Sequence, residues 1–265
     1  MSTILSWASG AIALAALVIP TTAAAEPHWQ VGAQKIYSNY GVTVVFDEIE
    51  VPTYWKSWNP KWRTVPTDAR SDCIRKLRLD LSNYDAAYVR KHLSKVFVLA
   101  GLSFNDADYG GTNDHIHKWL YIHAKWLGDD GSHKDAMGFH HEFSSILYKR
   151  NKGKFDEDAW RDVNVSDFEY AFEKSLEQNI RSGSIGLRGT PELYRAGFVC
   201  KYGQLTLEDD INTFAQQLLA KPGLLATRSA DYIRLRKKSE LLMAFLHETG
   251  YARGPTVIES QSTHH

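Results

Sequence analysis

The chain has 265 residues, of which 43% are hydrophobic and 12% aromatic, and its 31 basic residues balance its 31 acidic residues. This composition is typical of a globular protein that is long enough for one large domain or two small ones. Zero formal net charge gives no reason to expect nucleic acid or an anionic membrane surface as a partner.

The first residues differ from the rest of the chain. Residues 11–20, AIALAALVIP, form an apolar run too short to span a bilayer, and Ala23 and Ala25 are the small residues of a cleavage site before Glu26. We therefore predict a signal peptide over residues 1–25, with export to the periplasm or to the outside of the cell. No membrane anchor is expected to remain after cleavage, and an uncleaved apolar helix is the alternative.

Export also bears on the two cysteines, Cys73 and Cys200. An oxidising compartment permits a disulfide between them, whereas two buried thiols are equally compatible with the sequence.

The mature chain, residues 26–265, is expected to form a single α+β domain with a β-rich part over 26–126, an α-rich part over 127–250 and a flexible tail over 251–265. In the first part, the β-branched residues of 42–51 predict a strand, and the Trp- and Pro-rich segment 54–66 predicts a loop that covers the core. Apolar residues at helical spacing predict a helix over 85–99. A Gly-Gly turn at 110–111 then leads into a strand centred on Trp119 to Ala124.

Helical periods dominate the second part, and they predict helices over 133–149, 167–180, 207–220 and 229–248, the last ending near Gly250. The basic residues of 228–238 are expected to form a solvated helix face. Strands followed by helices in this order favour an α+β architecture over an alternating α/β sheet.

The helix predicted over 133–149 contains the sequence HEFSS, which begins like the zinc-protease signature H-E-x-x-H but has Ser145 where the second histidine belongs. Ser132 and Asp135 resemble a capping box at its start. An apolar stripe runs along one side, and His141 and Ser145 fall on the opposite side, where they could face a cleft. An isolated His-Glu pair on a helix is most often a solvated face, so its meaning depends on the surrounding segments.

Those segments carry a resemblance across residues 109–219. A strand preceded by YGGT, the helix FHHEFSSIL and, some fifty residues later, the segment GFVCKYGQLTLEDDINTFAQQLL together resemble the zinc-binding metallopeptidases of the gluzincin type. They are more distantly similar to the catalytic domain of anthrax lethal factor. The resemblance implies a zincin-like fold with a small N-terminal sheet, an edge strand beside the active helix, a helical C-terminal part, a zinc ion and a peptide or protein substrate.

The resemblance also implies roles for single residues. His141 matches the first histidine ligand, Glu142 the catalytic base, and Tyr202 the tyrosine that assists the reacting carbonyl. The acidic ligand is Glu208 or Asp209, and we prefer Glu208 because it projects with the apolar face of its helix while Asp209 points away. Acidic residues also favour a helix N-terminus for electrostatic reasons, which by itself would explain this cluster.

Another histidine would have to replace the one missing at Ser145, because a serine hydroxyl is a far weaker zinc ligand than imidazole. His123 on the predicted strand and His140 beside His141 are the possible extra ligands, while His133 lies at least two turns from His141. For His140 we expect a hydrogen-bonded position at the boundary of the core.

Three functions agree with this sequence. The first is an exported zinc-dependent metallopeptidase, in which metal-activated water hydrolyses a peptide bond and Glu142 acts as the base. The second is a catalytically degenerate pseudopeptidase that acts as a binding or interaction module. The third is a protein without a site, in which His141 and Glu208 would lie far apart.

Overall fold

The computed structural model describes residues 28–128, 138–171 and 186–253. The predicted signal peptide, the Ser132–Asp135 start and most of the helix predicted over 167–180 lie outside these ranges, and residues 167–171 are not helical. No helix in the described ranges is long and apolar enough to cross a membrane.

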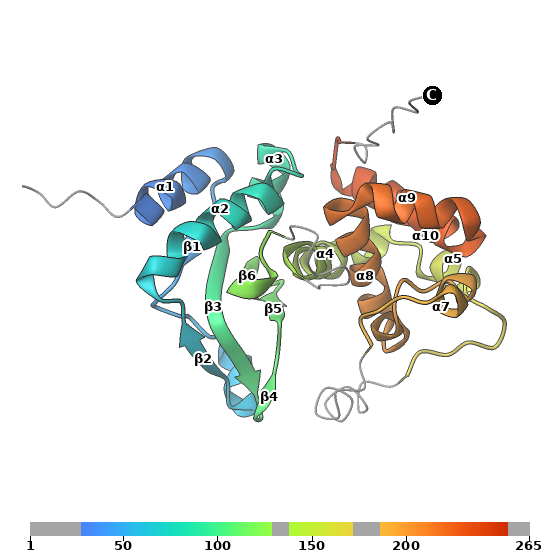
Figure 1. The fold of residues 1–265 in the computed structure, drawn as a ribbon, viewed down its shortest axis with the longest axis horizontal. Coiled ribbons are helices and arrows are strands. Elements are labelled where there is room, and N and C mark those ends of the chain that lie inside the picture. Colours follow the sequence, from blue (N-terminus) through green and yellow to red (C-terminus); the bar gives the residue numbers. More distant parts are fainter. Residues whose placement is uncertain (1–27, 129–137, 172–185, 254–265) are drawn as a thin grey trace, which may run out of the picture.

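The described chain alternates between helices and short strands up to residue 126 and is helical afterwards (Figure 1). The elements of the first part are α1 (His28–Tyr40), β1 (Thr43–Val45), η1 (Thr53–Trp58), β2 (Lys61–Thr64), η2 (Thr67–Ala69), α2 (Arg70–Leu81), α3 (Ala86–His92), β3 (Lys95–Phe104), β4 (Ala107–Asp108), β5 (Gly111–Asp114), β6 (Trp119–His123) and η3 (Ala124–Trp126). The elements of the second part are α4 (Phe139–Arg150), η4 (Lys152–Lys154), α5 (Glu157–Asp162), α7 (Pro191–Ala196), η6 (Lys201–Gln204), α8 (Leu207–Ala220), α9 (Pro222–Asp231) and α10 (Ile233–Thr249).

One mixed sheet of six strands organises the N-terminal part. Its order is β1-β3-β6-β5, in which β1 and β6 run parallel to β3 and β5 runs antiparallel to β6. The strands β2 and β4 pair with the C-terminal half of the ten-residue β3. The α+β class predicted from the sequence is therefore confirmed.

The two faces of the sheet pack against different partners. Val96, Val98 and Ile122 belong to the main core, which they share with residues of α2, α4 and α8. The alternate residues, such as Phe97 and Tyr121, form a smaller cluster closed by Trp55 of η1. The Trp-rich segment therefore covers one face of the sheet, as predicted, although it contains a 3-10 helix and the paired strand β2 and is not merely a loop.

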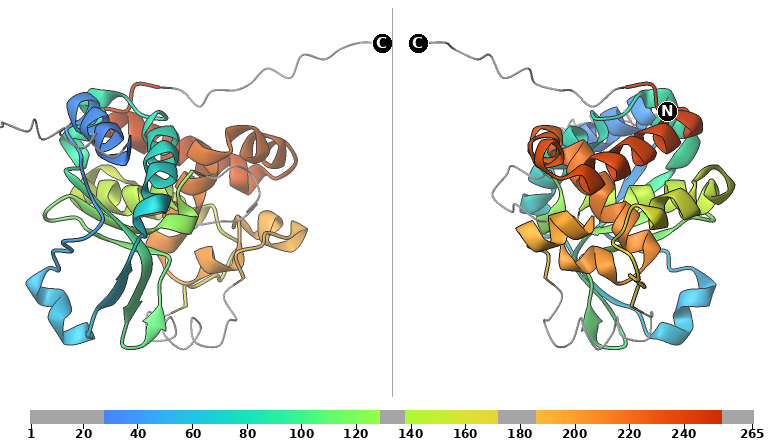
Figure 2. Two further views of the ribbon diagram at one scale, coloured as in Figure 1. Left: turned by 60° about the vertical axis from the view of Figure 1, so that its left-hand side comes forward. Right: turned by 90° about the vertical axis from the view of Figure 1, so that its right-hand side faces the viewer.

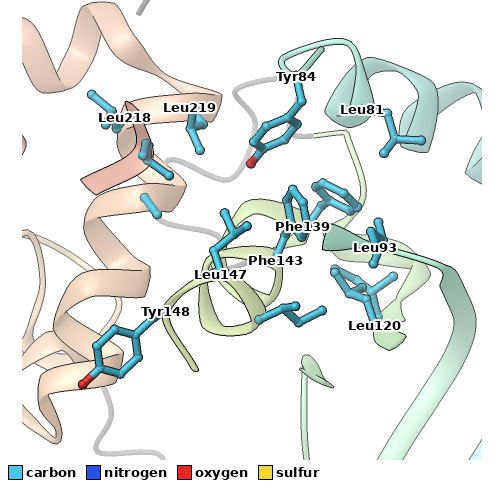
Figure 3. Close-up of a cluster of buried hydrophobic side chains, with 14 of the residues drawn as sticks. Leu81, Tyr84, Leu93, Leu120, Phe139, Phe143, Leu147, Tyr148, Leu218 and Leu219 are labelled. Atoms are coloured by element: carbon cyan, nitrogen blue, oxygen red, sulfur yellow. The ribbon is translucent and has the colours of Figure 1, made fainter. Parts of the chain in front are cut away.

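α4 is the central helix of the molecule. Figure 3 shows its Phe139, Phe143 and Leu147 side chains between Leu120 of the sheet and Leu218 and Leu219 of α8. The right view of Figure 2 shows the C-terminal helices in front of the sheet. α4 is thus enclosed on opposite sides, by the sheet and by α8.

Several predicted elements were wrong in type or extent. The helix predicted over 85–99 ends at His92, and Lys95 begins the longest strand, because Val96 and Leu99 fit a helical spacing as well as a strand. The strand predicted over 42–51 covers only Thr43–Val45, and α1 and α2 lie in a region predicted to be β-rich. The helix predicted over 207–220 is confirmed. The helix predicted over 229–248 is mostly α10, which begins at Ile233 and is followed by Gly250 in a left-handed conformation, while residues 229–231 belong to α9.

Of the two alternatives stated for the cysteines, two buried thiols are observed: Cys73 and Cys200 are both buried and are not joined by a disulfide. Lys238, predicted on a solvated basic face, is fully buried and forms an ion pair with Asp210 at 2.6 Å.

Candidate functional site

α4 has a polar side that faces α8. Its apolar residues pack toward the sheet, as the apolar stripe in the sequence predicted. His141 and Ser145 on the other side are buried, with exposed fractions of 4% and 1%. Both are enclosed because α8 packs along that side of α4. The predicted open face is therefore an interface between two helices.

The first turn of α4 receives its cap from another helix. The side-chain oxygen of Gln216 on α8 accepts hydrogen bonds from the backbone nitrogens of Gly138, at 3.2 Å, and His141, at 3.0 Å. The first N–H groups of a helix have no partner within the helix itself, and here a single buried amide satisfies two of them. α8 thereby fixes the position of His141 along the axis of α4.

Glu142 lies against the edge strand β5. Asn113 donates a hydrogen bond from Nδ2 to Oε2 of Glu142 at 3.2 Å, and a Cβ at Gly111 would lie 2.9 Å from the Glu142 Cγ. Desolvation raises the pKa of Glu142 to about 7. Near neutral pH this carboxyl group is therefore poised between its acid and base forms, as a general acid or base requires.

β5 is also where the predicted edge strand is corrected. The strand centred on Trp119 to Ala124 was expected at the edge, but β6 lies inside the sheet between β3 and β5. Gly111, predicted in a turn, belongs to the true edge strand. A glycine is needed at position 111 because the side chain of Glu142 occupies the space that the Cβ of any other residue would take.

His141 lies next to Tyr202. Their ring centroids are 5.8 Å apart, and the ring planes meet at 61°. Burial lowers the pKa of His141 to about 3, so the imidazole is neutral. The buried Nδ1 of His141 has no hydrogen-bond partner among the described residues. Buried polar atoms are normally paired, which makes this nitrogen a candidate for contact with a ligand.

Ser145 and Glu208 form a closed polar cluster with Lys149. The hydroxyl of Ser145 donates a hydrogen bond to Oε1 of Glu208, and the same oxygen lies 2.9 Å from the Lys149 ammonium. Glu208 thus contacts α4 one turn beyond His141, so the third function considered above, in which these two residues lie far apart, loses its support. Its carboxylate is already bound by a hydroxyl and a cation.

Asp209 lies on the side of α8 that faces Tyr202. It forms a side-chain hydrogen bond with Tyr202, and its Oδ2 accepts a hydrogen bond from Thr206 at 2.7 Å. Burial raises the pKa of Asp209 to about 7. We preferred Glu208 because it shares the apolar face of its helix. α8 is buried almost all round, so a position on the apolar face does not distinguish Glu208 from Asp209.

The remaining candidate histidines have separate roles. His140 is 1% exposed, with its Nδ1 2.8 Å from the Tyr84 hydroxyl, which makes it a hydrogen-bonded histidine of the core as expected. His123 is half-buried, and its Nδ1 accepts a hydrogen bond from the backbone of Lys125. His123 lines the same cleft as His141, whereas His133 lies outside the described residues.

A cleft of about 390 Å³ joins these groups to solvent. Glu142, His141 and Tyr202 lie on its wall, and β4, β5 and the Gly101 region of β3 form another part of the lining. Glu208 does not line this cleft and instead borders a separate hollow near Tyr148 and Arg161. The residues that the sequence grouped into one metal site are therefore divided between two sides of α8.

These donors do not fit a zinc site. Zinc in proteins is held by at least three strong nitrogen, sulfur or carboxylate ligands, whereas the candidate set offers one imidazole, one serine hydroxyl and one acidic ligand. Of the two carboxylates considered for that ligand, Glu208 is paired with Lys149, and Asp209 is hydrogen-bonded to Thr206 and Tyr202. Within residues 28–128, 138–171 and 186–253, no group of three His, Cys, Asp or Glu side chains could hold a metal ion.

Four contributors to the site were not predicted. Gln216 and Asn113 position His141 and Glu142, and Arg63 and Lys125 line the cleft. The glycine pair at 110–111 was the one available signal, since glycine inside a strand often marks a close approach of another group.

No protein-family model and no curated protein sequence matches this chain. A solved structure from Bacteroides caccae ATCC 43185, described as a "putative zinc-binding metallo-peptidase", matches it with a TM-score of 0.50 and 14% sequence identity. The match covers 85% of this chain and 88% of the other. At this identity the likeness concerns the fold, and function has to be argued from the site. The chain therefore shares its overall architecture with a protein described as a putative zinc-binding metallo-peptidase.

Proposed function

We propose that this protein binds peptides in a cleft of metallopeptidase type and does not hydrolyse them with zinc. The pairing of Glu208 with Ser145 and Lys149 carries the proposal. A carboxylate that neutralises a lysine and accepts a hydrogen bond from the residue in the second histidine position is not available to a metal at His141.

The cleft itself keeps the features that a peptide needs. β5 is the last strand of the sheet, and its pairing with β6 alternates between bonded and unbonded residues. Because Gly110 accepts a hydrogen bond from His123, the N–H and C=O groups of Gly111 and Asn113 point to the open edge. An extended peptide can add to such an edge through main-chain hydrogen bonds.

Zinc-dependent peptide hydrolysis is the second candidate. It is favoured by the unpaired Nδ1 of His141 and by the Glu142 carboxyl group, whose pKa of about 7 suits a general base. This function would require a ligand set other than the one predicted from the sequence.

Elemental analysis of gently purified full-length protein separates the two. We expect wild type to hold well below one zinc per chain and Ser145→His to gain zinc, since a second imidazole would then stand one turn from His141. The gain should disappear in Ser145→His combined with His141→Ala. One zinc per wild-type chain that is lost in His141→Ala, together with peptide hydrolysis, would establish the second candidate.

Peptide binding is tested by amide hydrogen exchange. Mixtures of blocked heptapeptides should slow exchange at Gly111 and Asn113, because their N–H groups would acquire partners on the peptide. The amides of β1, at the other end of the strand order and outside the cleft lining, are the internal control and should not change. Unaltered exchange along β5 at saturating peptide would reject pairing at this edge.

A further inference from the structure

Two cations reach the cleft from different elements. Arg63 of β2 and Lys125 of η3 both line it, and the charges of both act on His123 in the same lining. The Arg63 guanidinium donates a hydrogen bond to the Ala100 carbonyl at 3.3 Å, and the Lys125 ammonium lies 4.8 Å from the Trp126 ring centroid. Neither takes part in an ion pair among the described residues.

The fold makes room for Arg63 at this place. Arg63 stands opposite Gly101 in the register of β2 and β3, and a Cβ at Gly101 would lie 2.7 Å from Nε and 2.9 Å from Nη2 of the guanidinium. A Cβ at Gly101 would therefore displace the guanidinium from the place that it occupies over β3.

The cleft offers few anions to neutralise these cations. Asp108 and Glu142 are the carboxylates in the lining, and Glu142 already accepts a hydrogen bond from Asn113. Among the described residues neither carboxylate forms an ion pair with Arg63 or Lys125, so both cations can pair with a negative group of a ligand.

Apolar side chains accompany the charges. Leu102, Tyr109, Trp126 and Leu187 also line the cleft. A ligand that is complementary to these cationic and apolar side chains combines a negative group with apolar surface. Planar carboxylates suit the guanidinium of arginine, which can bind them through two parallel hydrogen bonds.

We infer that the peptide bound in this cleft carries a carboxylate, which Arg63 and Lys125 bind beside His123. This inference rests on the proposed peptide-binding function and adds its substrate class. The carboxylate has two sources, an Asp or Glu side chain or the C-terminus of the peptide.

Calorimetric titration of the full chain tests the inference with matched probes. One pair of acetylated, amidated heptapeptide mixtures differs only in a central Glu or Gln, and a second pair of neutral mixtures differs only in an unblocked or amidated C-terminus. We expect about tenfold tighter binding of the charged member of one pair at low salt. The pair that shows the preference identifies the source of the carboxylate.

Two variants test whether the guanidinium of Arg63 causes the preference for the charged peptide. Arg63→Gln should bring the charged and neutral mixtures to within about twofold, and Gly101→Ala should do the same by displacing the guanidinium while keeping its charge. Lys61→Gln is the matched control, because it removes a cation of the same strand that is bound to Asp106 outside the cleft lining. This control should retain the wild-type preference.

The outcomes distinguish the two proposals. Equal binding of charged and neutral peptides by wild type overturns the carboxylate preference and leaves peptide binding intact. A preference that survives Arg63→Gln and Gly101→Ala overturns the assignment to this cluster. Absence of binding by all four mixtures overturns both proposals together.

Discussion

Glu142 links the electrostatics of the cleft to the stability of the fold. Its pKa in the folded protein is about 7, compared with an ordinary value of 4.5, so the folded state holds this proton more tightly than the unfolded chain. Stability should therefore fall as pH rises through the window from about 4.5 to about 7. The full shift corresponds to about 3 kcal/mol, which solvent contact at the cleft reduces to about 1 to 2 kcal/mol.

The variant Glu142→Gln removes this titration. It should be more stable than wild type by about 1 to 2 kcal/mol at pH 8 and similar to it near pH 4.5, as measured by urea denaturation across this range. The comparison with wild type cancels the opposite effect of buried histidines such as His141. Glu240→Gln, at an exposed position of α10, serves as the control. An equal stability difference at both pH values would contradict the assigned cause.

The motif located these side chains in part. The resemblance assigned His141, Glu142 and Tyr202 to one site, and the structure places all three in the lining of one cleft, with the rings of His141 and Tyr202 in contact. The pairing of Lys149 with Glu208 was beyond prediction, because it depends on how α4 and α8 pack. The argument that favoured Glu208 over Asp209 loses its basis for a related reason, since a helix buried almost all round has no solvent face that would distinguish the two directions.

The contact between β5 and α4 depends on the small size of Gly111. In Gly111→Ala the new Cβ would lie 2.9 Å from Cγ and 3.0 Å from Oε1 of Glu142, and 3.0 Å from the Tyr121 carbonyl. We expect a loss of about 1 to 3 kcal/mol in the free energy of unfolding, because the strand must move away from the helix. Urea denaturation measures the loss.

Gly153→Ala is the matched control, since a Cβ there meets nothing within 4 Å. It should leave stability unchanged or raise it by less than about 1 kcal/mol. Equal stability of the two variants would show that β5 does not press against α4 as the structure has it.

Elements were predictable where a single period dominated. α8 was predicted at its observed limits because Thr206 caps it and its pattern is long. The prediction of one helix over 85–99 was wrong because the seven residues of α3 are followed closely by β3, whose apolar residues continue the helical spacing by chance. The choice of edge strand failed because strand order is set by long-range pairing, which local sequence does not encode.

A buried ion pair holds the C-terminal helices together. The ammonium of Lys238 on α10 lies 2.6 Å from Oδ2 of Asp210 on α8 and donates a hydrogen bond to the Gly197 carbonyl at 2.8 Å. Trp160 and Tyr170 also donate to Oδ2 of Asp210. One carboxylate therefore connects α5, α8, α10 and the segment around residue 170.

Removing the cation alone should be costly. Lys238→Met leaves the charge of Asp210 buried without its partner, and we expect a loss of about 3 to 5 kcal/mol in urea denaturation. Adding Asp210→Asn should recover much of it, because the amide oxygen still accepts hydrogen bonds from Trp160 and Tyr170. Lys237→Met, at the adjacent exposed position, should have little effect. A double variant no more stable than Lys238→Met would contradict the charge argument.

The hydrogen bonds from Gly138 and His141 to Gln216 have a consequence for the order of folding. These two hydrogen bonds can form only when α8 has docked, because their acceptor lies more than seventy residues away in the sequence. Capping of α4 beside the cleft is thus coupled to closure of the helical core. Amide protons at these two positions should exchange only when α8 separates from α4, and they would report every opening of the candidate site.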